Sequence, residues 1–75
     1  MSLEKLFAEV FTMSEADVVD SLQLQDIPSW DSMTHMVFIV RFEEQYQIQL
    51  EGDEIADLKS VGDARAALLA RGVAP

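Results

Sequence analysis

Three residues near the middle of the chain carry side chains that could do chemistry together: Asp31, Ser32 and His35. A serine becomes a nucleophile when a histidine takes its proton and a carboxylate orients that histidine. Residues three apart on a helix share a face, so His35 can lie beside Ser32. Asp31, however, adjoins Ser32 and is poorly placed to reach the far side of the imidazole, and no glycine-rich loop offers an oxyanion hole. A minimal Ser-His hydrolase is therefore a weak interpretation of these three residues.

The segment 31–46 is the element that must position these residues. Asp31 is a natural N-cap, which places Ser32 at the first position of a helix that runs to about Tyr46. A repeat of 3.6 residues predicts a core-facing stripe made up of Met36, Ile39, Phe42 and Tyr46. Several more apolar residues lie off that stripe: Met33, Val37, Phe38 and Val40. Such a helix is either well buried or offers an apolar face to a partner.

The remaining apolar spacing predicts an all-α fold in a single domain, residues 1–75. We expect three main helices at 3–11, 31–46 and 60–71, and a short helix at 53–58 capped by Asp53. A long loop joins the first two main helices, with a helical turn at 14–17. The loop residues expected to reach the core are Val18, Val19, Leu22, Leu24 and Ile27. The rest of the predicted core comprises Leu6, Phe7, Val10, Met36, Ile39, Phe42, Ile55, Val61 and Leu68, with Leu69 as a further candidate.

Several motifs follow one another in a familiar order. Trp30-Asp31-Ser32-Met33 opens the second main helix, which ends in Phe42-Glu43-Glu44-Gln45-Tyr46. Ile48-x-Leu50, Asp53-Glu54-Ile55 and Leu58-x-Ser60-Val61-Gly62-Asp63 come after it. This order and spacing, from about Leu3 to Leu69, resemble the acyl and peptidyl carrier proteins, which place a serine after an aspartate at the start of their second helix.

The resemblance implies a carrier and not an enzyme. In that family a phosphopantetheinyl transferase attaches a 4′-phosphopantetheine arm from coenzyme A to the serine, here Ser32, flanked by Asp31 and His35. The arm holds acyl or aminoacyl groups as thioesters, and the other partners are enzymes that load, modify and transfer those groups. A helix N-terminus suits this role, because its free N–H groups favour a phosphodiester.

This sequence departs from the fatty-acid carriers on the side of the helix nearest Ser32. Those carriers usually have acidic residues two and five positions after the serine, where this chain has Thr34 and Val37, and Arg41 adds a basic group further along. Within the family that the chain resembles, this departure points to a specialised carrier of polyketide, nonribosomal peptide or sugar-modifying pathways. The expected partner-binding residues are Met33, Thr34, Val37, Val40, Arg41 and Glu44.

The composition limits the partners. Fourteen acidic and 5 basic residues give a formal net charge of −9, which repels nucleic acid and anionic membranes and favours basic protein partners. We expect a cytoplasmic monomer, since the N-terminal residues do not resemble a signal peptide. The same charge also fits a small acidic adaptor that carries no arm. With no cysteine, and with glutamines at two positions where a calcium loop needs carboxylates, we predict no metal site.

Overall fold

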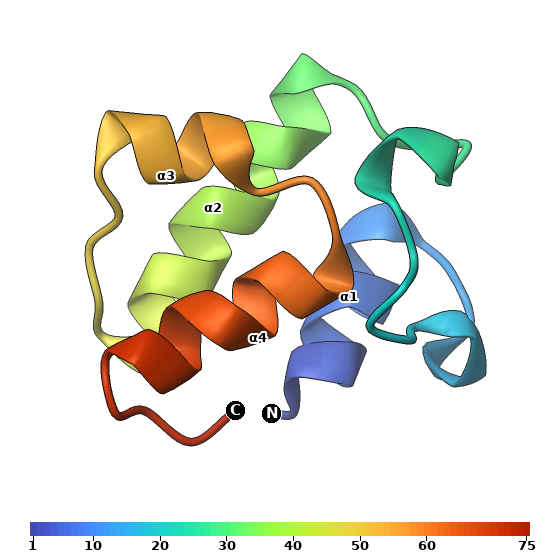
Figure 1. Cartoon of the computed structure of the whole chain (residues 1–75). Coiled ribbons are helices and arrows are strands. Elements are labelled where there is room, and N and C mark those ends of the chain that lie inside the picture. Colours follow the sequence, from blue (N-terminus) through green and yellow to red (C-terminus); the bar gives the residue numbers. More distant parts are fainter.

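The computed structural model describes residues 1–75 as a bundle of four α-helices (Figure 1). The elements in chain order are α1 (Leu3–Phe11), the 3₁₀ turns η1 (Glu15–Asp17) and η2 (Leu24–Asp26), α2 (Ser32–Tyr46), α3 (Gly52–Asp57) and α4 (Val61–Ala70). The structure contains no strand, only one isolated antiparallel bridge between Gln23 and Ser60. The predicted all-α class is confirmed, and η2 is an addition that the sequence did not indicate. No helix is long and apolar enough to cross a membrane.

Polar side chains at the helix starts set most of the boundaries. Ser2 caps α1 by accepting a hydrogen bond from the Lys5 amide, 3.0 Å long. Ser60 and Asp63 form the predicted capping box at α4. Gly72 follows the last helix with φ near 70°, a left-handed conformation that ends a helix at little cost in glycine.

The predicted cap of the short helix is wrong by two residues. Glu51, not Asp53, is the N-cap of α3. Its backbone N–H donates to Glu54 Oε1 over 3.0 Å, and this bond helps to set the start of the helix at Gly52. Asp53 lies inside the first turn, where its Oδ1 accepts from the Glu54 amide. Glu51 and Asp53 could both cap this helix. Glu51 is the cap because a second carboxylate, that of Glu54, lies three residues after it and bonds back to its N–H.

Four phenylalanine rings form the centre of the core. The rings of Phe7 and Phe38 stack with centroids 4.3 Å apart, Phe42 lies 5.2 Å from Phe38, and Phe11 lies 5.9 Å from Phe38. All four side chains are at most 1% exposed. The aromatic cluster joins α1 to α2 and so fixes which face of α2 points inward.

The sequence-based stripe on α2 was wrong at two positions. Phe38, which lies off the predicted stripe, is fully buried, and Met36, which belongs to the predicted stripe, is 46% exposed. The buried face follows Phe38, Ile39 and Phe42 because the ring of Phe38 fills the space between α1 and α2. Met36, two residues before Phe38, points to nearly the opposite side of the helix.

The rest of the predicted core was largely confirmed. Leu6, Phe7, Ile39, Phe42, Val61 and Leu68 are buried, whereas Val10 and Ile55 are only half-buried. Val19 and Leu69 are exposed, because each adjoins a residue, Val18 or Leu68, that takes the inward direction at that place.

The long first connection is held against α4. Val18, Leu24 and Ile27 bury their side chains in the core as predicted. Backbone bonds then tie the loop to the start of α4, including Leu24 N to Lys59 O at 2.9 Å. On the outside, Arg65 of α4 pairs with Glu4 and Asp20, and its hydrogen bond lowers the pKa of Glu4. This connection is therefore an ordered wall of the fold.

Candidate functional site

Ser32 is the first residue of α2, and its side chain is exposed. Asp31 caps the helix: Asp31 Oδ1 accepts from the Thr34 amide at 2.8 Å, and the Asp31 amide donates to Thr34 Oγ1 at 2.9 Å. The Ser32 hydroxyl takes part in none of the hydrogen bonds at this helix start. The capping box thus holds the helix start with neighbouring groups and leaves the serine oxygen free.

The contribution of the Asp31 cap to the stability of the fold depends on pH. The hydrogen bond that Asp31 accepts from the Thr34 amide lowers the pKa of the carboxyl below its usual value. A carboxyl with a lowered folded-state pKa stabilises the fold above its unfolded-state pKa, and that contribution is lost as the pH falls through the lowered value.

We expect Asp31→Asn to lower the melting temperature near neutral pH and to match the wild type once the pH lies below the lowered pKa of Asp31. Asparagine keeps the capping geometry, so the difference reports the charge. Thermal melts followed by circular dichroism between pH 7 and pH 2 measure it. Asp26→Asn is the control, because the exposed Asp26 side chain caps no helix. A difference that persists unchanged at the lowest pH would show that Asp31 stabilises α2 without its charge.

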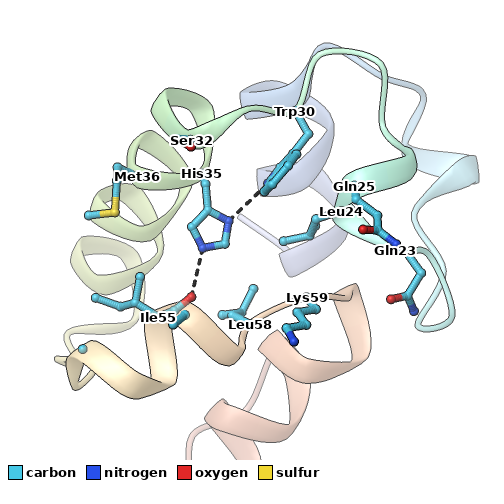
Figure 2. A pocket seen from close by; sticks show the side chains of 12 residues that line it. Gln23, Leu24, Gln25, Trp30, Ser32, His35, Met36, Ile55, Leu58 and Lys59 are labelled. Atoms are coloured by element: carbon cyan, nitrogen blue, oxygen red, sulfur yellow. Dashed lines mark hydrogen bonds between the residues drawn. The ribbon is translucent and has the colours of Figure 1, made fainter.

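His35 bridges two elements instead of facing Ser32. The Trp30 indole Nε1 lies 3.2 Å from His35 Nδ1, and His35 Nε2 lies 3.0 Å from the carbonyl oxygen of Ile55 on α3 (Figure 2). An indole N–H only donates and a carbonyl only accepts, so the imidazole that satisfies both is neutral with its proton on Nε2. Neither nitrogen is left to take a proton from Ser32, and this arrangement argues against the Ser-His hydrolase.

A cavity of about 610 Å³ opens beside Ser32 between α2, α3 and the first connection. Half of its 12 lining residues are hydrophobic. Ser32, His35 and Met36 line it from α2, and Ile55 and Ala56 line it from α3. No pattern in the sequence indicates this cavity, because its walls come from segments far apart in the chain.

The exposed face of α2 next to Ser32 is largely apolar. Met33 is 76% exposed, and Met36, Val37 and Val40 are each between 46% and 48% exposed. Isolated apolar residues on a surface are normal, but four on one helix face form a patch of the kind that contacts partners. Met36 joins this surface in place of the core.

The other expected partner residues are less uniform. Glu44 is exposed, but Thr34 is half-buried and its hydroxyl belongs to the capping box. Arg41 is half-buried and forms an ion pair with Glu9 of α1 at 3.0 Å. The structure therefore gives Thr34 and Arg41 contacts within the fold that the sequence did not indicate.

Comparison with solved structures finds acyl carrier proteins. A holo acyl carrier protein from Geobacter metallireducens is 36% identical, with a TM-score of 0.76, and the match covers 93% of this chain and 84% of that one. A protein from Mycobacterium tuberculosis assigned as an acyl carrier protein has a TM-score of 0.80 at 16% identity, over 93% of this chain and 99% of that one. No family model and no curated protein matches the sequence.

These neighbours define the class of protein. A four-helix fold shared over nearly the whole length, together with 36% identity, identifies a carrier protein and not an enzyme. The chain belongs to the acyl carrier protein family.

Proposed function

We propose that this protein carries acyl groups as thioesters on a 4′-phosphopantetheine arm attached to Ser32. The observation that carries the proposal is the exposed serine at the first position of α2, with its side-chain oxygen outside the capping box that surrounds it. The relative from Geobacter metallireducens is a holo acyl carrier protein, which supports such an arm in this family.

The residues around Ser32 fit the arm. The Ser32 amide is one of the first-turn N–H groups that have no partner within the helix, and Asp31 satisfies the Thr34 amide instead. A phosphate group at this place meets positive partial charge. The chain has no cysteine, so the arm would supply the thiol that forms thioesters.

A phosphopantetheinyl transferase would attach the arm with coenzyme A and magnesium. The Ser32 hydroxyl oxygen forms the new phosphodiester bond, the pyrophosphate bond of coenzyme A breaks, and adenosine 3′,5′-bisphosphate leaves. The hydroxyl proton passes to a base on the transferase, because His35 has no free nitrogen to accept it. The other partners would be enzymes that load, modify and transfer the acyl group.

The test is a count of thiols. The purified chain contains none, and after incubation with coenzyme A, magnesium and a broad-specificity transferase it should contain one per molecule. That thiol should accept an acyl group in a bond that hydroxylamine cleaves. The reaction without transferase is the control. A folded protein that gains no thiol with any transferase would favour the acidic adaptor.

We place the carrier in a specialised pathway instead of fatty-acid synthesis. The support is the apolar face of α2, where Val37 is 46% exposed and no acidic residue follows Ser32 until Glu43. A basic partner enzyme that binds acidic residues near the serine would have none to contact on this part of the helix.

With the arm attached to both proteins, the double variant Thr34→Asp/Val37→Glu should therefore accept a malonyl group from a fatty-acid malonyl transferase faster than the wild type. We expect a gain of up to about tenfold at low salt that shrinks as salt rises, because attractive charge mainly speeds the encounter. Val37→Glu alone separates the charge from any change in the cap at Thr34. Val19→Glu is the matched control, since Val19 is a 51% exposed valine outside α2. Efficient loading of the wild type with no gain in the variants would remove the case for a specialised pathway.

A further inference from the structure

We infer that the cavity beside Ser32 selects acyl groups whose far end carries a carboxylate, and that Lys59 is the residue that selects them. The inference rests on the proposed attachment at Ser32 and goes on to name the class of cargo. It depends on where the polar side chains lie around the cavity and on which charges of the chain are already paired.

The wall of the cavity nearest Ser32 contains both polar and apolar residues, and the middle of the cavity is lined mainly by apolar ones. Met36 from α2 and Ile55 from α3 lie on one side of His35, and the buried Leu24 and Leu58 lie toward Gln23 and Lys59 (Figure 2). Because Ser32 itself lines the cavity, an arm attached there starts at the cavity, and the acyl group on its terminal thiol can reach this apolar surface when the flexible arm folds back. A chain of methylene groups would be favoured in this part.

The side of the cavity away from Ser32 is polar. Gln23, Gln25 and Lys59 lie there, opposite Ser32 in Figure 2. The bridge between Gln23 and Ser60 and the 2.9 Å bond from Leu24 N to Lys59 O bring these residues together from two segments far apart in the sequence. A cargo that extends along the apolar middle therefore ends beside amides and an ammonium group.

Lys59 is one of two cationic side chains that the fold leaves without an ion pair. Each of the three arginines pairs with a carboxylate, as Arg71 does with Glu54, whereas neither Lys59 nor Lys5 does so. Asp57, two residues before Lys59, forms no ion pair with it, and Asp63, four residues after it, accepts instead from the backbone N–H groups of Lys59 and Ser60 at 3.0 and 3.1 Å. The Lys59 ammonium is thus free to bind an anion.

The positive charge of Lys59 favours some cargoes over others. The protein as a whole is at −9, which disfavours a free carboxylate and favours an amine. Lys59 reverses that preference at the end of the cavity, because a carboxylate there meets a cation and two hydrogen-bonding amides. A neutral alkyl end would instead leave the polar end of the cavity to water.

The test compares three cargoes that each have six carbon atoms. Transferase and the corresponding acyl-coenzyme A place hexanoyl, adipoyl or 6-aminohexanoyl groups directly on the protein. The rate of thioester cleavage by hydroxylamine is measured for each, relative to the same free acyl-coenzyme A. We expect the adipoyl group to be protected about threefold more than the hexanoyl group, the factor typical of an exposed ion pair, and the 6-aminohexanoyl group to be protected least. The amide signals of Lys59 and Gln25 should shift in the spectrum of the adipoyl protein.

Two variants complete the experiment. Lys59→Gln should reduce the adipoyl protection to the hexanoyl value, and Lys5→Gln, which removes the other unpaired cation on α1, should leave it unchanged. Equal protection of hexanoyl and adipoyl groups, greatest protection of the amine, or full protection in Lys59→Gln would each overturn the inference. A protein that takes up no acyl group in any reaction would instead overturn the proposed function.

Discussion

Replacing Ser32 with alanine is expected to abolish the gain of mass and of the single thiol while leaving the fold intact. The side chain is exposed, and its hydroxyl is not among the groups that cap α2, so little is lost when it is removed. Alanine also has the highest intrinsic helix propensity, so it should not disrupt the first turn. Circular dichroism and the melting temperature should therefore match the wild type, while intact mass shows no addition from coenzyme A.

Ser29→Ala is the matched control for that experiment. Ser29 lies three residues before Ser32, and its hydroxyl donates to the carbonyl oxygen of Phe11 at 2.6 Å. Losing this bond should cost about 1 kcal/mol of folding free energy, and the modification should remain complete. Modification that persists in Ser32→Ala, or that disappears equally in Ser29→Ala, would refute the assignment of Ser32.

The second large effect concerns stability. Phe38→Ala should destabilise the fold by about 3–5 kcal/mol, because it leaves a cavity among the rings of Phe7, Phe11 and Phe42. Domains have roughly 0.05–0.15 kcal/mol of stability per residue, so this loss takes a large share of what a chain of 75 residues holds. Urea unfolding followed by circular dichroism measures the change.

Met36→Ala distinguishes the observed core from the one that the sequence predicted. Met36 is 46% exposed, so its truncation should cost less than about 1 kcal/mol. If Met36→Ala cost more than Phe38→Ala, the face of α2 described here would be turned the wrong way.

The sequence predicted the starts of the three longer helices well because they depend on local interactions, whereas it misplaced the start of α3. Ser2, Asp31 and Ser60 each cap a helix through a hydrogen bond within three residues, and such bonds are visible in the order of residues. The face of α2 was harder, since apolar residues occur on most sides of that helix. Met36 and Phe38 point to nearly opposite sides, and the periodicity alone does not decide which of them faces inward. The position of the neighbouring aromatic rings on α1 decided it.

The candidate site was predictable only in part. Asp31, Ser32 and His35 stand close together in the sequence, and their arrangement at the start of a helix follows from that. The bond from His35 to Ile55 and the convergence of Gln23 with Lys59 join residues at least 20 positions apart. Contacts of this kind arise from the packing of α3 and of the first connection, and one sequence alone does not contain them.

The measurement that tests the central claim most directly is the position of the added mass on the wild-type protein. After reaction with coenzyme A, magnesium and a transferase, the folded protein is digested and its peptides are fragmented in a mass spectrometer. We predict one phosphopantetheine per chain, on Ser32. Its location on another serine would contradict the account, the alternatives being Ser2, Ser14, Ser21, Ser29 and Ser60.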